Sequence, residues 1–296
     1  MTEARVCALC PRRCRARRLP LTGAGVCGMG YLPMVARAAP HFDEEPCISG
    51  SRGSGAVFFS GCALGCVYCQ NSPIRAGGAG RALTAPQLRA VFDRLAEKGV
   101  HNLNLVTASH FVDAVAHALE PRFPLPVVYN SGGYESIEAL RLLEGKVQIY
   151  LPDFKYPDEA GGRRYAAAPD YPAVARAALV EMARQVGPVV LDKDGVAASG
   201  LIVRHLVLPG RTAQAIEVLN FIAGELPKGT YVSLMAQYLP VNCGDYPEID
   251  RRIYRREYDR VVDRMLQLGL DDGYVQGLSA AQARYIPPFD LTGVGD

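Results

Sequence analysis

The sequence of 296 residues lacks any long apolar run, and none approaches the ~20 consecutive apolar residues that a membrane-spanning helix needs. No apolar segment of the secretory type follows the charged residues Met1 to Arg18, so no signal peptide is expected. The formal net charge is only +2, which argues against a dedicated nucleic-acid binder. With 49% hydrophobic residues, the chain is not mainly disordered. These features predict a folded cytoplasmic protein with neither a membrane nor nucleic acid as its partner.

The chain also lacks the cysteine pattern of a disulfide-stabilised protein. Its nine cysteines are an odd number in a long chain, whereas an extracellular disulfide framework uses an even number in a short one. Cys47 and Cys243 stand alone and are expected to be packing residues. The other seven form two groups, which are Cys7, Cys10, Cys14 and Cys27, and then Cys62, Cys66 and Cys69. Grouped thiols in a reducing compartment indicate metal or redox chemistry.

Strand-like and helix-like segments alternate along the body of the chain. Strands are expected at 56–59, 102–106, 127–130, 147–153, 201–208 and 231–239, and helices at 84–98, 109–119 (with Ser109 as N-cap), 135–143, within 158–185, at 212–223 and at 249–266. Six such units predict a parallel sheet with right-handed crossovers, two units short of a closed TIM barrel. The expected fold is an α/β partial (β/α)6 TIM-type barrel, with its active site at the carboxyl ends of the strands.

The chain is expected to have three parts. Residues 1–40 form a Cys- and Arg-rich metal-binding extension, residues 41–280 form the partial barrel, and residues 281–296 form a C-terminal tail. The barrel part opens with a short acidic linker, His41 to Pro46.

Three cysteines follow the first strand of the barrel directly, with the spacing Cys62-x3-Cys66-x2-Cys69. Three thiolates this close can hold three corners of an iron–sulfur cubane and leave one iron open for a substrate or cofactor. Structural zinc is an alternative, but it takes four ligands, and no further Cys or His follows nearby. A trio of buried, unligated thiols is the other alternative.

This spacing, with the aromatic Tyr68 just before the last cysteine, resembles the signature of the radical S-adenosylmethionine (radical SAM) enzymes. The resemblance implies that Cys62, Cys66 and Cys69 bind a [4Fe–4S] cluster whose fourth iron chelates S-adenosylmethionine (SAM) near Tyr68. It also implies a barrel of the radical SAM kind. An external donor, such as a flavodoxin- or ferredoxin-like protein, would supply an electron, and a 5′-deoxyadenosyl radical would then take a hydrogen atom from the substrate.

Further segments resemble the activating enzymes of pyruvate formate-lyase and its relatives. They are Glu44-Glu45-Pro46, Gly55 to Cys62, Cys69-Gln70-Asn71, Asp153-Phe154-Lys155, and Arg204 with Val207 to Gly210. The likeness runs from about residue 40 to residue 240. It implies that the substrate is a partner protein, a glycyl-radical enzyme that loses a hydrogen from a glycine Cα. Two alternatives remain: a radical SAM enzyme that modifies a small metabolite or RNA, and a non-catalytic metal-binding protein that interacts with RNA.

The resemblance also assigns the residues that would bind SAM. Lys155 would pair with the SAM carboxylate, and Arg204 would help to orient the cofactor. Asp153, with Asn130 and Ser131, would frame a monovalent cation, although the family usually has Asp in place of Asn130. His205 should point away from the site, because successive strand residues face opposite sides.

One motif of the family is missing. A Gly-Gly-Glu segment usually follows the second strand and holds the methionine amino group, but here the sequence reads Thr107-Ala108-Ser109-His110. We expect the backbone carbonyls of Thr107 and Ala108 to take this role, with Ser109 as a polar substitute and His110 as a helix residue. The segment Gly132 to Glu135 follows the third strand and is not counted as that motif.

The N-terminal cysteines, Cys7-x2-Cys10-x3-Cys14-x12-Cys27, predict a second metal site. Zinc and an iron–sulfur cluster both remain open, as do four unligated thiols. Five arginines lie among these cysteines: Arg12, Arg13, Arg15, Arg17 and Arg18. They are expected to form a solvated face or to neutralise the thiolates, with a phosphate or nucleic-acid contact as the alternative.

Overall fold

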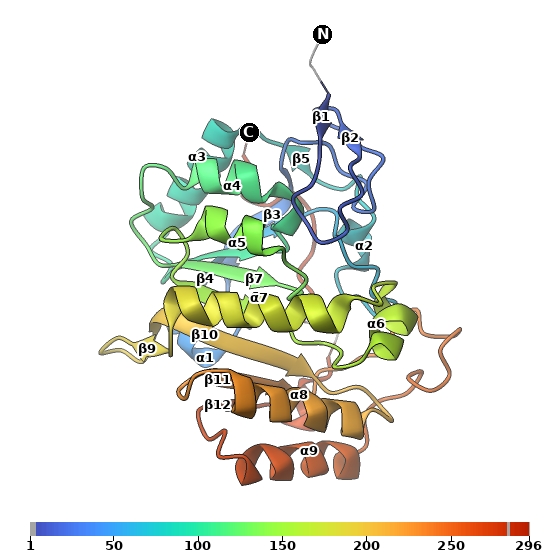
Figure 1. The fold of residues 1–296 in the computed structure, drawn as a ribbon. Helices are drawn as coiled ribbons and strands as arrows, with labels where there is room; N and C mark the ends of the chain where they lie inside the picture. The colour runs from blue at the N-terminus through green and yellow to red at the C-terminus, as the bar shows by residue number, and fades with distance from the viewer. Residues whose placement is uncertain (1–3, 283–284, 296) are drawn as a thin grey trace.

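The computed structural model describes residues 4–282 and 285–295, and its centre is a mostly parallel sheet (Figure 1). Residues 1–3 of the expected extension and residues 283, 284 and 296 of the expected tail lie outside the described residues. Six consecutive parallel strands form the middle of the sheet: β4 (Ser54–Phe59), β6 (Leu103–Val106), β7 (Val127–Ser131), β8 (Ile149–Pro152), β10 (Ala197–Leu206) and β11 (Tyr231–Met235). Each strand pairs with the next of these in the chain, which confirms the predicted parallel sheet.

Helices connect these strands and cover one face of the sheet. They are α3 (Ala85–Glu97), α4 (Val112–Ala118), α5 (Ile137–Leu143), α6 (Glu159–Ala166), α7 (Tyr171–Val186) and α8 (Thr212–Glu225), with α9 (Arg255–Gln267) after the last of the six strands. Figure 1 shows α3, α4, α5 and α7 side by side, and each of them packs against the next. The predicted class, an α/β partial barrel, is confirmed. Among the described helices, none is long and apolar enough to cross a membrane.

The sheet has strands that the sequence did not predict. β3 (Met34–His41) runs antiparallel to β4, and β5 (Arg81–Ala82) pairs with β3. At the other edge β12 (Gly273–Val275) adds a parallel strand beside β11, and β9 (Val190–Leu191) pairs with β10. β3 is rich in alanine and contains Pro40, residues with little tendency to form strands. Its pairing with β4 therefore depends on the tertiary structure.

Several predicted boundaries were wrong. The helix expected at 109–119 begins as a 3₁₀ turn, η1 (Ser109–Phe111), and Ser109 caps neither this turn nor α4. Its hydroxyl donates to the Glu135 carboxylate instead. The last helix begins at Arg255 rather than at 249, because Tyr254 is its N-cap and Glu257 accepts a hydrogen bond from the Tyr254 N–H. The strand expected at 231–239 ends at Met235, and β10 spans 197–206 rather than 201–208.

The start of α3 follows the local sequence closely. Thr84 is its N-cap, and the Thr84 N–H donates to the Gln87 side chain at 2.8 Å in the predicted capping box. The predicted apolar stripe is buried; it consists of Leu88, Val91, Phe92 and Leu95. The turn beyond the helix has Gly99 at φ +76°, a conformation that favours glycine.

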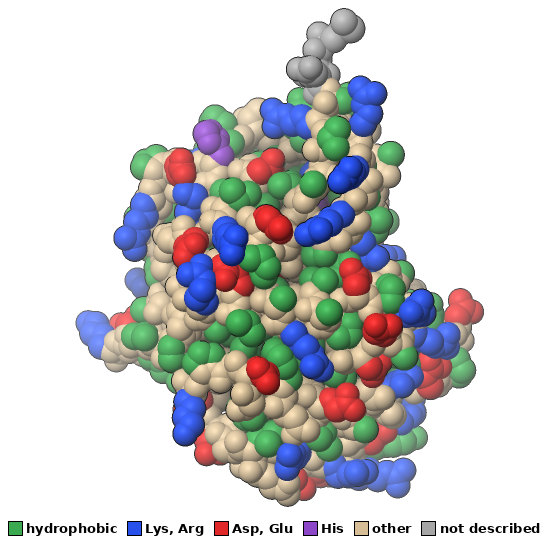
Figure 2. Space-filling view, viewed as in Figure 1, with side chains coloured by type: hydrophobic (Ala, Val, Ile, Leu, Met, Phe, Trp, Pro, Cys, Tyr) green, Lys and Arg blue, Asp and Glu red, His purple; other side chains and the backbone are tan. Residues whose placement is uncertain are grey.

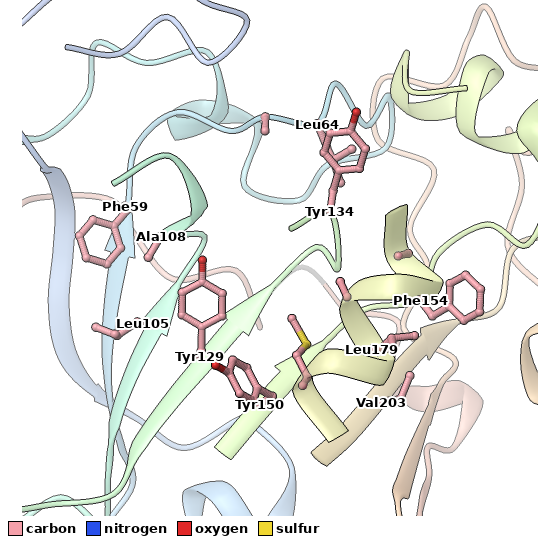
Figure 3. Close-up of a cluster of buried hydrophobic side chains, with 14 of the residues drawn as sticks. Phe59, Leu64, Leu105, Ala108, Tyr129, Tyr134, Tyr150, Phe154, Leu179 and Val203 are labelled. Atoms are coloured by element: carbon pink, nitrogen blue, oxygen red, sulfur yellow. The ribbon is translucent and has the colours of Figure 1, made fainter. Parts of the chain in front are cut away.

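The helix-covered face of the sheet forms the main hydrophobic core. Phe59, Leu105, Tyr129, Tyr150 and Val203, on successive strands, are buried there with side chains from the helices (Figure 3). Burial of one such large apolar side chain contributes roughly 1.5–3 kcal/mol. Since side chains alternate along a strand, the neighbours of these residues face the inside of the partial barrel.

The inner face of the sheet has an apolar end and a polar end. The short helix α1 (Pro46–Ser49) lies at the end where the parallel strands begin (Figure 1), and its Cys47 and Ile48 pack against Val128, Ile149, Leu151 and Ile202. Cys47 is therefore a packing residue, as predicted. Beyond this layer, the inward residues of β6, β7 and β10 include the polar side chains of Asn104, Asn130 and Arg204, which form the floor of the candidate site, while Phe58 and Val106 form a separate apolar cluster beside it.

Candidate active site

The signature cysteines lie in the loop that leaves the carboxyl end of β4. Cys66 is buried, and Cys62 and Cys69 are half-buried. The turn before them needs a glycine: Gly61 has φ +83°, and a Cβ there would lie 3.0 Å from the Cys27 carbonyl oxygen and even closer to the Met29 side chain. The loop is therefore shaped by close contact with the N-terminal extension.

The three thiols influence one another electrostatically. Burial raises the pKa of the Cys62 thiol to about 12, and Cys66 and Cys69 add to the shift. Burial also raises the pKa of Cys69 to about 11. The ammonium of Lys155 acts in the opposite direction on all three. As free thiols these groups would be protonated, and metal binding would be needed to hold them as thiolates.

The donor set of this loop is the one that a [4Fe–4S] cluster uses, three thiols that can each bind an iron. A structural zinc takes four ligands. Within residues 4–282 and 285–295, no group of three or more Cys, His, Asp or Glu side chains is arranged to hold a metal ion.

Asp153, at the carboxyl end of β8, bridges two cations. Its carboxylate accepts from the Lys155 ammonium at 2.5 Å and from the Arg204 Nε at 2.8 Å. Burial alone would raise the pKa of Asp153, but Arg204 and Lys155 outweigh it and hold this pKa below its usual value. Burial would lower the pKa of Lys155, but Asp153 and the Cys66 thiol raise it above the usual value. Lys155 is thus a charged side chain next to the signature thiols.

Glu44 extends this network across the inside of the barrel. One carboxylate oxygen accepts from the amides of Asn104 (3.1 Å) and Asn130 (3.0 Å), and the other accepts from Arg204 at 3.2 Å. Asn130 in turn accepts from Arg204 at 2.6 Å. Sequence reasoning did not single out Glu44 or Asn104 as site residues. The only signal for Glu44 was its place in the Glu44-Glu45-Pro46 string.

The predicted substitute for Gly-Gly-Glu has an unusual backbone. Thr107, at the end of β6, has φ +63°, which is rare for a β-branched residue and costs on the order of 1–3 kcal/mol. Its N–H donates to the Asn130 carbonyl at 2.8 Å. Strain of this size at a strand end is typical of residues that position a ligand.

Ser109, the expected polar substitute, is bound within the protein. Its hydroxyl donates to Glu135 at 2.5 Å, and Tyr129 donates to the same carboxylate at 3.2 Å. Burial raises the pKa of Glu135 to about 7, although the bonds from Ser109, Ser131 and Tyr129 oppose the shift. Glu135 follows the third strand, as the sequence indicated, yet its carboxylate reaches the residue that follows the second strand. Sequence reasoning missed this contact.

Tyr68 fixes the signature loop against aromatic neighbours. Its hydroxyl lies 2.7 Å from the Tyr156 hydroxyl, and its ring meets the edge of Tyr238 with centroids 5.6 Å apart. Gln70 donates to the Gln237 carbonyl at 3.3 Å, which ties the loop to the segment after β11.

The two histidines near the site are structural in their contacts. His205 points away from Arg204, as predicted, and its Nδ1 lies 2.7 Å from the Phe154 carbonyl. His110 lies in η1, and its Nε2 is 2.8 Å from the Ser60 carbonyl. Burial lowers the pKa of each to about 4, so both are neutral at pH 7.

Two of the N-terminal arginines hold the extension against the barrel. Arg12 donates to the carbonyls of Ala63 (2.8 Å), Ala166 (3.1 Å) and Ala167. Arg18 is buried and donates to the carbonyls of His110 (2.7 Å), Met29 (3.1 Å) and Gly30. The expectation of a solvated face is therefore wrong for Arg18, and also for Arg12, which is half-buried. It is correct for Arg13, Arg15 and Arg17, which are exposed.

The sequence profile of the radical SAM superfamily matches residues 56–222. This stretch is more than half of the chain and contains the signature cysteines, Asp153, Lys155 and Arg204. The chain therefore belongs to the radical SAM superfamily. Membership implies a [4Fe–4S] cluster, the cofactor SAM, and cleavage of SAM to a radical.

Comparison with individual proteins found the following similarities. The uncharacterized protein MJ0674 of Methanocaldococcus jannaschii is 26% identical over 276 residues, covering 90% of this chain and 75% of that protein. Among solved structures, Streptococcus suis SuiB bound to S-adenosylmethionine has a TM-score of 0.49, and HydG, a maturase of the [FeFe]-hydrogenase, has 0.47; both are 14% identical. They cover 74% and 78% of this chain, which spans about half of each of those chains (49% and 53%).

Proposed function

We propose that this chain is a radical SAM enzyme of the activating-enzyme type, which takes a hydrogen atom from a glycyl-radical enzyme. The observation that carries the proposal is the contiguous site made of the signature loop, the Asp153–Lys155 and Asp153–Arg204 pairs, and Glu44. Each of these residues belongs to a segment that resembles the activating enzymes. When bound and reduced, the cluster and SAM supply a carbon radical that abstracts hydrogen.

The chain's own residues would bind and orient SAM. Lys155 is charged and lies close to the cysteine thiols, and Asp153 is its only partner among the described ion pairs. Its ammonium has donors left over, so it could also donate a hydrogen bond to the SAM carboxylate. Arg204 is held by hydrogen bonds to Asp153, Glu44 and Asn130, so its guanidinium is a fixed positive charge that would help to orient SAM. Fixed charges need no reorganisation during the reaction.

Three other residues would complete the cofactor site. The carbonyls of Thr107, whose backbone is strained, and of Ala108 would accept from the methionine amino group, and Ser109 with its partner Glu135 would supply polar atoms in place of the missing glutamate. Tyr68 would keep the signature loop in place through Tyr156 and Tyr238. In this proposal Asn130 supports Arg204, and a monovalent cation would lie beside Asp153.

Anaerobic reconstitution tests the enzyme. The reconstituted protein should be brown and, with a chemical reductant, should convert SAM to 5′-deoxyadenosine and methionine. The variant in which Cys62, Cys66 and Cys69 are serine should not cleave SAM, whereas Cys243→Ala, which removes a buried thiol outside both cysteine groups, should match the parent. A colourless protein that holds only zinc would contradict the proposal.

A second measurement tests the type of substrate. A glycyl-radical EPR signal that appears on a candidate partner only with the active chain would support the activating-enzyme type. SAM cleavage that is stimulated by a small metabolite or by RNA, with no such signal, would favour the alternative radical SAM reactions. A flavodoxin- or ferredoxin-like protein is the proposed electron donor.

We propose in addition that Cys7, Cys10, Cys14 and Cys27 form a second metal site, separate from the SAM-binding cluster. In support of it, two of these sulfurs lie near one point: a Cβ built at Gly25 would lie 3.1 Å from the Cys14 sulfur and 4.0 Å from the Cys27 sulfur.

A further inference from the structure

Arg75 is a half-buried cation without a partner. It ends α2 (Ser72–Arg75), the short helix that closely follows Cys69. Its Nε is buried and has no hydrogen-bond partner. Among residues 4–282 and 285–295, the guanidinium makes no hydrogen bond, ion pair or cation–π contact at all. Because an arginine stays charged in a protein, its buried donor needs an acceptor.

This lack of partners distinguishes Arg75 from the other arginines. In the described part of the chain, every other arginine that is buried or half-buried makes at least one hydrogen bond. They are Arg12, Arg18, Arg37, Arg89, Arg204, Arg211, Arg251 and Arg264. On the face shown in Figure 2, Lys and Arg side chains are interspersed with Asp and Glu, so exposed cations have carboxylates nearby. A buried donor without an acceptor is destabilising, and its presence indicates that another group accepts from it.

The backbone fixes Arg75 beside the signature loop. The N–H of Gly61, just before the first signature cysteine, donates to the Ile74 carbonyl at 2.8 Å, so the end of α2 is tied to the start of the loop. The Arg75 Nη1 lies 3.8 Å from the position that a Cβ would take at Gly65, the residue before Cys66. The guanidinium therefore lies against the backbone between the first two signature cysteines.

The charge of Arg75 acts on the same thiols as that of Lys155, but no carboxylate offsets it. Burial raises the pKa of Cys66 and of Cys69, and the positive charge of Arg75 opposes the shift at both. Lys155 opposes it too, but the Asp153 carboxylate, 2.5 Å away, offsets much of the ammonium charge. Within the described residues, Arg75 has no carboxylate at ion-pair distance. Its full charge is therefore available to an anion in the loop.

The anion that this position favours is the cluster of the signature loop. Membership of the superfamily implies a [4Fe–4S] group on Cys62, Cys66 and Cys69, and the sulfur atoms of such a group accept hydrogen bonds. Because the Arg75 Nε is closed to solvent, its acceptor has to lie inside the protein. A substrate carboxylate is the other anion that an arginine could bind, but it would arrive from solvent and could not reach this nitrogen.

We propose that Arg75 donates hydrogen bonds to sulfur atoms of the signature-loop cluster and raises its reduction potential. One-electron reduction makes the cluster more negative by one charge, so a cation beside it stabilises the reduced form more than the oxidised form. The inference rests on the cluster that superfamily membership implies, and it does not depend on the activating-enzyme type of the proposed function.

A redox titration followed by EPR tests the inference. After anaerobic reconstitution, the midpoint potential is measured for the signal that is missing from the variant in which Cys62, Cys66 and Cys69 are serine. Arg75→Gln removes the charge and should make reduction about tenfold less favourable, which lowers the potential by about 59 mV for one electron. Arg75→Lys keeps the charge and should lower the potential less than half as far.

The matched control is Arg122→Gln, because Arg122 is exposed and lies in the turn that leads to the amino end of β7. Its potential should equal that of the parent. Equal potentials in Arg75→Gln and Arg122→Gln would overturn the inference. Iron lost from Arg75→Gln but kept in Arg75→Lys and Arg122→Gln would support it, because the charge would then be needed to hold the cluster. A parent that takes up no iron would overturn the inference together with the proposed function, so the two failures are distinguishable.

Urea unfolding of the chain before reconstitution is a second measurement that needs no cluster. Arg75 has no protein partner to lose, so Arg75→Gln should not lower the free energy of unfolding. Arg12→Ala, which loses hydrogen bonds to backbone carbonyls, should lower it. A loss in Arg75→Gln as large as that in Arg12→Ala, or a failure to fold, would show that Arg75 is needed for the fold itself and would overturn the inference.

Discussion

Replacing Asp153 by asparagine tests the charge network at the centre of the site. The carboxylate bridges Lys155 at 2.5 Å and Arg204 at 2.8 Å, and the three side chains are only 14–18% exposed. Removing one member of a buried ion pair typically costs 3–5 kcal/mol, because the partner charge is left unpaired. Arg204 keeps its bond to Glu44 and the site has some solvent access, so we expect the lower end, about 3 kcal/mol.

The assay is urea unfolding of the reconstituted protein without SAM, with the free energy of unfolding taken at an unchanged m-value. The matched control is Glu120→Gln, which removes an exposed carboxylate 2.5 Å from Lys146 and should change nothing measurable. The pKa of Asp153 is depressed in the folded protein, so its contribution is present above the unfolded pKa of about 3.9 and is lost only as the pH falls below that value.

The difference between parent and Asp153→Asn should therefore be constant between pH 5 and pH 8. A loss as small as that of the control would refute the reasoning, because it would mean that water already screens the two cations. A loss that disappears near pH 6 would refute the assigned direction of the Asp153 pKa.

Three further predictions concern the neighbours of this site. Gly61→Ala should destabilise the protein more than Gly99→Ala. Both positions have positive φ, but a Cβ at Gly61 would contact the extension, whereas a Cβ at Gly99 would have no atom within 4 Å. Equal losses of unfolding free energy in urea would contradict the close contact at Gly61. Arg12→Ala should lower the free energy of unfolding by about 2 kcal/mol, because it removes charged hydrogen bonds to backbone carbonyls, and it should speed proteolysis of the extension. Arg13→Ala removes only an exposed ion pair and should have neither effect. Identical digestion rates for the two variants would count against docking of the extension by Arg12. Burial lowers the pKa of His205 to about 4, so the imidazole binds a proton less tightly in the folded state than in the unfolded state. Protonation of His205 therefore lowers the free energy of unfolding as the pH drops from about 6.5 toward 4. His205→Gln should therefore lose less stability than the parent between pH 7 and pH 5, and parallel pH profiles would show that His205 is protonated in the fold.

The extension and the barrel form one structural unit around the signature loop. Arg12 donates to the Ala63 carbonyl within this loop, Arg18 donates to the His110 carbonyl in η1, and Gly61 provides the close contact. A loop fixed in this way holds its thiols in one geometry before a cluster binds, which reduces the entropy lost on binding. The N-terminal segment is therefore part of the architecture of the active site.

The sequence alone was sufficient for the local features of this protein. The alternation of apolar segments predicted the parallel sheet, and the positions of Cys62, Cys66 and Cys69 predicted that the three thiols share one loop after the first parallel strand. The two-residue period of a strand placed Arg204 and His205 on opposite faces, and both are found there. These predictions succeed because each depends on residues close together in the chain.

Only the tertiary structure decided the contacts between distant segments. Helix α1 closes the barrel at one end, and Glu44 lies just before its N-cap, Glu45. This position brings the Glu44 carboxylate to Arg204, which is 160 residues further along the chain. Arg12 reaches Ala166 across 154 residues, and Glu135 reaches Ser109 from the neighbouring strand end. No local pattern in the sequence predicts these contacts. They arise because the sheet brings the carboxyl ends of its parallel strands to one edge, where the N-terminal extension packs against them.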